Sequence, residues 1–266
     1  MAEGTVMEIR GLTMRFGGVT AIDNLSMSIP EKKVVGLIGP NGAGKTTVFN
    51  VITGFYRPQE GQVVFQGLAM TELEPKTVCA LGVARTFQNI RLFAGGTVLD
   101  NVMTGCHVRQ DSRWWMAPLR LPIFLKEENE IRKKSYALLE RLGLSHLADE
   151  KASSLPYGAQ RRLEIARALA TDPTFLLLDE PAAGMNPQES ADLMRFIEKV
   201  RDEFDLTILM IEHDMKVVMG VCSHIWVLEY GRLIAEGGPD EIRANPDVIA
   251  AYLGTPKPLI DEGGAI

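Results

Sequence analysis

The chain has 266 residues, of which 46% are hydrophobic and 23% charged, and its formal net charge at pH 7 is -6. This length suffices for one large domain or two small ones, and the acidic balance argues against a nucleic-acid binder with a broad basic surface. Cys79, Cys106 and Cys222 show no C-x-x-C spacing, which argues against structural disulfides and a zinc site and suits a reducing cytosol. No segment reads as a signal peptide or as a bilayer span, so we expect any membrane role to run through a partner.

The first elements are predicted to be strands. Residues 6–16 and 21–29 read as a half-solvated antiparallel ribbon, because Leu25, Met27 and Ile29 alternate with polar residues. Residues 34–38 are apolar throughout, which indicates a strand that is covered on both faces. Residues 61–66 are predicted to form another short strand.

A phosphate-binding loop is predicted directly after the strand at 34–38. Nine consecutive residues carry the pattern G-x-x-x-x-G-K-[ST]: Gly39, Pro40, Asn41, Gly42, Ala43, Gly44, Lys45, Thr46 and Thr47. The glycines let backbone N–H groups approach phosphate oxygens, and a helix that begins near Lys45 adds partial positive charge. We expect Lys45 to reach the β- and γ-phosphates of a nucleotide and the Thr46 hydroxyl to bind Mg²⁺.

The middle of the chain is predicted to be mainly helical. Residues 83–87 are expected to return to the core sheet and to place Gln88 at its end, and residues 89–162 follow as helices. Within them, residues 127–142 read as a charged helix with an apolar face, ended by Gly143. Three interpretations of the apolar segment 114–125 stay open: local packing, contact with a membrane partner, and an interfacial membrane helix, which its prolines disfavour.

A second chemical motif follows a buried strand at residues 175–178. Asp179 and Glu180 come at the carboxyl end of that strand, where ligands of open α/β sheets bind. Asp179 suits a contact with Mg²⁺ through water, and Glu180 suits a base that polarises an attacking water. With the phosphate loop, these carboxylates predict a nucleoside triphosphatase.

The rest of the chain alternates again. A helix at 187–204, a strand at 207–211, and a hairpin of strands 225–230 and 233–236 are predicted. Pro239 and Pro246 each suit the first turn of a short helix, and the tail after residue 254 is expected to be loose. The pattern therefore predicts an α/β core with a helical insertion and an antiparallel sheet at its N-terminal side.

Residues 155–169, Leu-Pro-Tyr-Gly-Ala-Gln-Arg-Arg-Leu-Glu-Ile-Ala-Arg-Ala-Leu, resemble the signature motif of ATP-binding cassette (ABC) ATPases. By this resemblance Phe16 stacks on adenine, Gln88 senses Mg²⁺ and water, and His213 contacts the γ-phosphate. Residues 183–186 match the D-loop, and Tyr157 and Gly158 hold the ATP of a facing subunit. Alone, Phe16 would read as a core aromatic, Gln88 as a polar strand end and His213 as a packing residue.

The same resemblance implies a fold: a P-loop NTPase core with a mainly parallel sheet, an N-terminal antiparallel β subdomain and an inserted α-helical subdomain. It implies a single ABC ATPase domain at 1–254 and a flexible tail at 255–266. Within the domain, the core and β subdomain take up about 1–88 and 163–254, and the helical subdomain about 89–162.

Several segments resemble one branch of the family in their detailed sequence, namely the first ATPase subunit of branched-chain (hydrophobic) amino-acid importers. The similar segments are 107–126, 161–167, 181–187, 211–220 and 251–254. This resemblance implies ATP and Mg²⁺, integral-membrane permease subunits, a second ATPase subunit in a head-to-tail dimer, and indirectly an extracytoplasmic solute-binding protein. It also implies peripheral binding at the cytoplasmic face of the membrane, and no nucleic acid.

Other functions stay open at this point. They are a urea- or amide-type importer, a lipid exporter, a soluble ABC ATPase that acts on ribosomes or DNA, and a regulator that binds nucleotide without hydrolysis. The acidic charge and single cassette argue against an ATPase that acts on ribosomes or DNA, and Glu180 argues against a regulator without hydrolysis.

The signature motif departs from its family, since Pro156 replaces the usual Ser and Ala159 stands where Gln or another polar residue is common.

Overall fold

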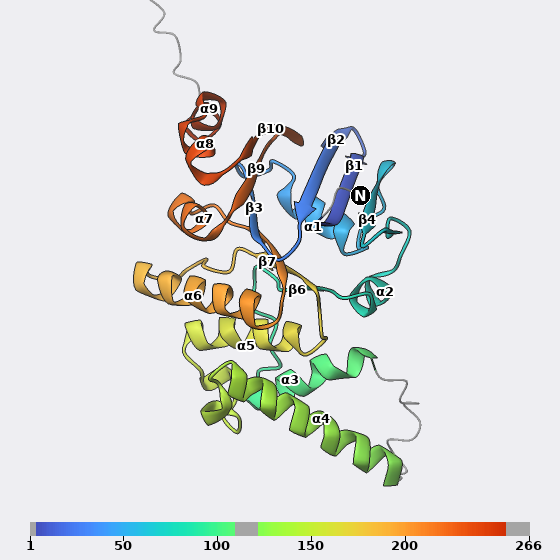
Figure 1. Cartoon of the computed structure of the whole chain (residues 1–266), viewed down its shortest axis with the longest axis vertical. Coiled ribbons are helices and arrows are strands. Elements are labelled where there is room, and N and C mark those ends of the chain that lie inside the picture. The colour runs from blue at the N-terminus through green and yellow to red at the C-terminus, as the bar shows by residue number, and fades with distance from the viewer. Residues whose placement is uncertain (1–3, 110–121, 254–266) are drawn as a thin grey trace, which may run out of the picture.

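A computed structural model describes residues 4–109 and 122–253 of the chain. Figure 1 shows two sheets in the upper part of the molecule and a layer of helices, α3, α4 and α5, at its lower end. This arrangement confirms the predicted α/β architecture with an antiparallel sheet at the N-terminal side. The expected division into a core at 1–88 and 163–254 and a helical subdomain at 89–162 remains a prediction.

The smaller sheet is antiparallel, with strand order β2-β1-β4-β5. Its strands are β1 (Thr5–Phe16), β2 (Val19–Pro30), β4 (Glu60–Phe65) and β5 (Leu68–Ala69). Three of them fall within two residues of the predicted strands, and β5 is a short addition that the sequence pattern did not predict. The alternation of buried and exposed residues along β2 confirms the expected half-solvated ribbon.

The larger sheet has the order β10-β9-β3-β8-β7-β6. Its strands are β3 (Val34–Ile38), β6 (Val83–Arg85), β7 (Phe175–Asp179), β8 (Thr207–Ile211), β9 (His224–Glu229) and β10 (Arg232–Gly237). All pairs are parallel except the hairpin of β9 and β10. The carboxyl ends of β6, β7 and β8 therefore meet at one edge of the sheet.

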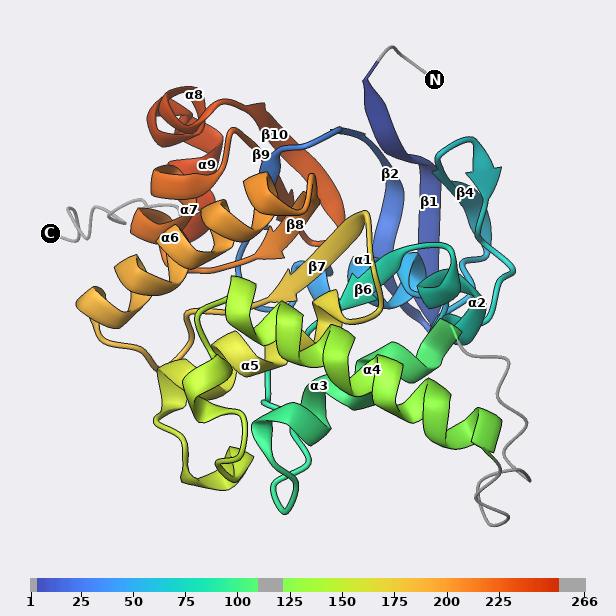
Figure 2. The same cartoon turned by 60° about the horizontal axis from the view of Figure 1, so that its bottom comes forward.

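Helices cover this sheet on both faces, as Figure 2 shows. The helices outside the lower layer are α1 (Lys45–Ile52), α2 (Pro75–Ala80), α6 (Pro187–Glu203), α7 (Met215–Val221), α8 (Pro239–Ala244) and α9 (Pro246–Leu253). Val35 and Leu37 of β3 pack into the core beside α1 and the smaller sheet, whereas Val34 and Ile38 pack into the core on the opposite face. This double coverage explains why the predicted strands were apolar throughout.

The helical layer consists of α3 (Val98–Cys106), α4 (Pro122–Arg141) and α5 (Tyr157–Leu169), with 3₁₀ turns at His107–Arg109, Ser145–Leu147 and Ala152–Ser154. The predicted start of the charged helix at residue 127 is wrong, because α4 begins at Pro122. Proline is well suited to the first helical turn, where its missing N–H has no intrahelical partner. Gly143 follows in the left-handed conformation expected after a helix end.

Two earlier predictions fall largely outside the described residues. The interpretation of the apolar segment 114–125 concerns residues 114–121 and the side chains of 122–125, and the loose tail concerns residues 255–266; all of these lie outside the described residues. Within the described ranges, none of the helices has the combination of length and apolarity that a bilayer crossing requires.

Candidate functional site

Two glycines of the loop after β3 pack closely against the backbones of β9 and β2. Gly39 and Gly44 have φ angles of 148° and 102°, which strongly favour glycine. A Cβ at Gly39 would lie 2.0 Å from the carbonyl oxygen of Leu228, and one at Gly44 would lie 2.5 Å from that of Ala21. A side chain at either position would push the loop away from the neighbouring strand, so both positions need glycine for this close packing.

Lys45 is the buried cation of this loop. Its Nζ donates hydrogen bonds to the carbonyl oxygens of Gly39, at 2.7 Å, and Pro40, at 2.9 Å. Burial lowers the pKa of the Lys45 ammonium, and the nearby carboxylates of Glu180 and Asp179 partly oppose this effect. Lys45 thus has two carbonyl partners and no ion pair among the described residues, an arrangement that suits a phosphate.

The two carboxylates at the end of β7 lie in different surroundings. Asp179 is buried and accepts a hydrogen bond from Nη2 of Arg85 at 2.8 Å. Glu180 has a positive φ of 46°, and its N–H donates to the carbonyl of Ile211 at the end of β8 over 2.9 Å. The two carboxylates have different partners, since Asp179 contacts Arg85 and the Glu180 side chain contacts two other predicted site residues.

Gln88, Glu180 and His213 are brought together. Nε2 of Gln88 donates to Oε2 of Glu180 at 2.7 Å, and Nδ1 of His213 lies 3.6 Å from Oε1 of the same carboxylate. The three residues follow β6, β7 and β8, so the strand order places them side by side. The sequence alone offered His213 no unique partner, and the fold supplies Glu180.

The residues present fit a magnesium nucleotide. Within the described part of the chain, no group of three or more His, Cys, Asp or Glu side chains could hold a metal ion by itself. Mg²⁺ commonly binds through one or two protein groups together with waters and substrate phosphates, so this does not count against it. Thr46, Gln88 and Asp179 line one cavity of about 360 Å³ beside the phosphate loop.

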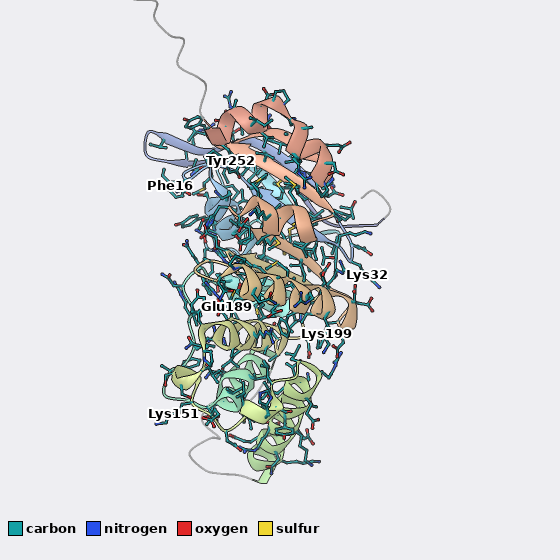
Figure 3. The ribbon with its side chains drawn as sticks, turned by 90° about the vertical axis from the view of Figure 1, so that its left-hand side faces the viewer. Phe16, Lys32, Lys151, Glu189, Lys199 and Tyr252 are labelled. Atoms are coloured by element: carbon teal, nitrogen blue, oxygen red, sulfur yellow. The ribbon has the colours of Figure 1, made fainter. Side chains whose placement is uncertain are left out.

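Phe16 ends β1 with a 43% exposed side chain. Its ring meets that of Tyr56 edge to face, with the centroids 5.2 Å apart. Figure 3 shows Phe16 at the same edge of the molecule as Glu189 and Lys151, opposite Lys32 and Lys199. The exposed ring is therefore available to a ligand on the edge that also carries the start of α6.

The signature segment forms the start of helix α5 and does not line the cavity beside the phosphate loop. Pro156 is the N-cap residue, and Gly158 lies in the first turn, with no atom within 4 Å of where a Cβ would stand. Gly158 lines a separate cavity of about 260 Å³ together with Leu144 and Met185. The Tyr157 hydroxyl donates to the carbonyl of Ala183 at 3.0 Å, which links the signature to the segment after Glu180.

Two buried residues of α5 fasten the segment that carries Gln88. Nη1 of Arg161 donates to the carbonyl of Phe87 at 2.9 Å and to Glu164 at 3.0 Å, and Nη2 donates to the carbonyl of Gln88. Burial raises the pKa of Glu164, and the Arg161 cation opposes this effect. Sequence reasoning missed this pair, although an Arg and a Glu three apart among apolar helix positions was an available signal.

Glu212 is a second residue that sequence reasoning missed. It is buried, and its carboxylate accepts hydrogen bonds from the N–H groups of Ala182, at 2.8 Å, and His213, at 3.3 Å. Burial raises the pKa of Glu212, while these two N–H donors lower it. The carboxylate therefore ties together the turn after Glu180 and the start of the segment that carries His213.

Comparisons with known proteins agree with this geometry. A family model described as ABC transporter matches residues 22–183, and one described as branched-chain amino acid ATP-binding cassette transporter matches residues 232–257. The chain is 46% identical over 249 residues to the high-affinity branched-chain amino acid transport ATP-binding protein LivG of Salmonella typhimurium, with 94% of this chain and 98% of the relative covered. It is also 46% identical to BraF of Pseudomonas aeruginosa, with the same coverage. The solved ADP conformation of MJ1267, an ATP-binding cassette of an ABC transporter, matches with a TM-score of 0.83 at 33% identity, covering 94% of this chain and 99% of that chain.

Proposed function

Because this chain belongs to the ABC transporter family, we propose that it is the ATP-hydrolysing subunit of an importer for branched-chain amino acids. The observation that carries the proposal is its 46% identity, over 94% of its length, to LivG and BraF. The match of residues 232–257 to a branched-chain family model supports the same branch. These likenesses favour amino-acid cargo over the urea, amide and lipid alternatives.

The chain's own residues would bind the triphosphate. Lys45 exchanges the carbonyls of Gly39 and Pro40 for phosphate oxygens, and the exposed face of Phe16 receives the base. The backbone N–H groups at the start of α1 face the phosphates. The buried ammonium thereby gains an anionic partner in direct contact, which none of the described residues provides.

The magnesium half of the site would use the Thr46 hydroxyl directly, Asp179 through a water molecule, and the Gln88 side chain. Bound Mg²⁺ neutralises phosphate charge and polarises the γ-phosphoryl group. Glu180 accepts the proton of the attacking water, while Gln88 holds one oxygen of this carboxylate by a hydrogen bond and His213 lies beside the other. The ends of β6, β7 and β8 thus each contribute at least one group to hydrolysis.

We place Tyr157 and Gly158 in the site of a facing ATPase subunit, either a second copy or a sister chain. The reason is geometric, since Gly158 has open space in front of its first-turn backbone and does not share the cavity that Thr46 lines. The start of the 13-residue helix α5 points its partial positive charge at such a ligand. Proline at position 156 removes one side-chain donor and leaves these backbone features intact.

An apolar groove between α2, α3 and α5 suits a permease segment. It has a volume of about 420 Å³ and is lined by residues that include Val78, Phe93 and Arg167. Phe93 is 58% exposed, and Arg167 holds the preceding segment by donating to the carbonyl of Arg91. Docking there would keep the chain at the cytoplasmic face of the membrane, where the permeases couple it indirectly to a solute-binding protein.

Uptake in cells that lack this chain tests the cargo. We expect the wild-type gene to restore uptake of labelled leucine, and Glu180→Gln to fail at equal expression. Restored uptake of urea or an amide with no change in leucine uptake would overturn the amino-acid assignment. ATP turnover by purified protein that depends on ribosomes or DNA would overturn the transport assignment.

Cysteine cross-linking in the assembled transporter tests the groove. We expect Phe93→Cys to cross-link to a permease cysteine, and Glu229→Cys and Asp240→Cys to serve as controls that do not. Efficient cross-links from the two control positions, with none from Phe93→Cys, would refute this docking site.

A further inference from the structure

Arg85 is a buried arginine that the proposed chemistry does not use. It ends β6, next to Asp179 at the end of β7, and its side chain is 7% exposed. Nη2 donates to Oδ2 of Asp179 at 2.8 Å, and Nη1 donates to Oδ1 of Asn50 on α1 at 2.7 Å. One guanidinium therefore joins the Asp179 carboxylate to the helix that starts with Lys45 and Thr46.

Aromatic rings fix the guanidinium in place. Its central carbon lies 5.4 Å from the centroid of the Phe49 ring and 5.2 Å from that of Phe87. Arginine stacks favourably on such rings, and its planar fork reaches two acceptors at once. Among the described residues, Nε has no hydrogen-bond partner, so the fold tolerates one unsatisfied donor while Nη1 and Nη2 keep their acceptors.

Stability alone does not account for this ion pair. Buried ion pairs are often replaceable by apolar residues with little or no loss of stability. Arg85 is placed where its charge acts on one acceptor of the proposed magnesium site. Asp179 uses Oδ2 for Arg85, whereas Oδ1 accepts no hydrogen bond from any described residue. Asp179 also lines the cavity that Thr46 and Gln88 line.

We propose that Arg85 is a positioning residue for magnesium: by holding Oδ2 of Asp179, it leaves Oδ1 turned toward the waters of the metal. This inference rests on the proposed hydrolysis of MgATP. The hydrogen bond holds the carboxylate in one orientation, and Asn50 and the two rings hold the guanidinium in its place. Residues that orient a ligating group typically change metal affinity by about 10–100-fold when they are replaced.

The test separates magnesium from nucleotide. ATP affinity is measured by calorimetry in EDTA and then across a titration of MgCl₂, for the wild type and for Arg85→Met. We expect ATP affinity in EDTA to be unchanged and the half-saturating Mg²⁺ concentration to rise about 10-fold or more. Arg85→Lys keeps the charge without the fork, so it should fall between the two.

Two controls keep the test decisive. Arg141→Met removes another arginine that pairs with a carboxylate, Glu203, and lies over a ring, Phe204, so it should match the wild type. In the background of Asp179→Asn, Arg85→Met should add no further shift, because Arg85 acts through that carboxylate. The double variant also avoids an unpaired buried charge if Arg85→Met alone does not fold.

The outcomes are distinguishable. If wild-type ATP binding does not respond to Mg²⁺, the proposed function fails. If the wild type responds and the Arg85 variants respond identically, only the role of Arg85 is overturned. An equal loss of ATP affinity with and without Mg²⁺ would also overturn it, because that result indicates general damage to the site.

Discussion

The side-chain amide of Gln88 donates a hydrogen bond to the carboxylate of Glu180 over 2.7 Å, although 92 positions separate the two residues. His213 approaches the other oxygen of this carboxylate at 3.6 Å. Arg161 in turn donates hydrogen bonds to the backbone carbonyls of Phe87 and Gln88. The proposed base is therefore linked through Gln88 to the helix that carries the signature motif.

Glu180→Gln should separate nucleotide binding from hydrolysis. The amide keeps the size of the side chain but cannot accept the proton of water, so turnover should fall by a factor on the order of a hundred or more. ATP binding by calorimetry should persist, and an ATP-bound dimer should accumulate on size-exclusion chromatography. Glu203→Gln, which removes a surface carboxylate paired with Arg141, is the control. Near-normal phosphate release by Glu180→Gln would place the catalytic base elsewhere.

Gly158→Asp should abolish hydrolysis while the single subunit still binds ATP. A Cβ at this position meets no atom within 4 Å, so the fold should tolerate the change, whereas the new carboxylate would face the γ-phosphate of the other subunit's nucleotide. Gly158→Ala is the matched control and should keep most of the activity. Normal phosphate release by Gly158→Asp would show that α5 does not complete a partner's site.

Pro156→Ser should raise ATPase activity modestly. A serine at this N-cap can donate its hydroxyl to the γ-phosphate across the dimer, and one hydrogen bond to a charged group contributes about 1.5–3 kcal/mol. Melting temperature and ATP affinity of the monomer should stay close to those of the wild type. Phosphate release and ATP-driven dimerisation are measured in parallel, and a decrease in both would contradict the expectation.

ATP affinity should fall as the pH rises through the pKa of Lys45 in the free protein. Burial lowers that pKa, and bound phosphate stabilises the ammonium, so binding above the lowered pKa must take up a proton. Below that pKa the lysine is already charged, and the affinity should not change for this reason. Calorimetry at alkaline pH in buffers of different ionisation enthalpy measures the proton uptake, with Lys134→Met as a surface control.

Lys45→Ala should abolish tight MgATP binding, and an unchanged affinity would contradict the assigned role.

Arg161→Met should destabilise the protein through Glu164. Both side chains are at most 3% exposed, and leaving one buried charge unpaired costs about 3–5 kcal/mol. When Glu164→Gln is added to Arg161→Met, the double variant should recover much of the lost free energy of unfolding, as measured with denaturant. Without Arg161 the pKa of Glu164 rises further, so the folded state binds the proton more tightly than the unfolded state. The stability of the single variant should therefore fall as the pH rises above the ordinary glutamate pKa. A deficit that is the same at pH 5 and pH 8 would refute this cause.

Cys222 should resist thiol reagents in the folded protein. Burial raises the pKa of its thiol to about 12, whereas Cys79 and Cys106 are partly exposed. Because the thiolate is the reactive form, Ellman's reagent at pH 8 should leave Cys222 unmodified until denaturant is added. Cys222→Ala should remove only the thiol that becomes reactive after denaturant is added, and a rapid loss of the Cys222 thiol in native protein would contradict the burial.

Much of the fold was predictable because its elements carry local signals. The strands at 34–38, 175–178 and 207–211 were found because a strand buried on both faces is a continuous apolar run, and the phosphate loop was found because its pattern is contiguous. The start of α4 was misplaced because Pro122 suits a loop as well as a first helical turn. The short elements β5, α2 and α7 went unpredicted because two to seven residues carry too little periodicity.

The sequence by itself thus determined which chemical groups the protein has and that they stand at strand ends. Only the tertiary structure decided that Gln88 faces Glu180, that Arg85 holds Asp179, and that Arg161 fastens Phe87. These partners depend on the order β8-β7-β6 and on the packing of α5 against the segment after β6. Strand order is set by burial of the whole apolar core, a free energy summed over residues far apart in the chain, so no local pattern contains it.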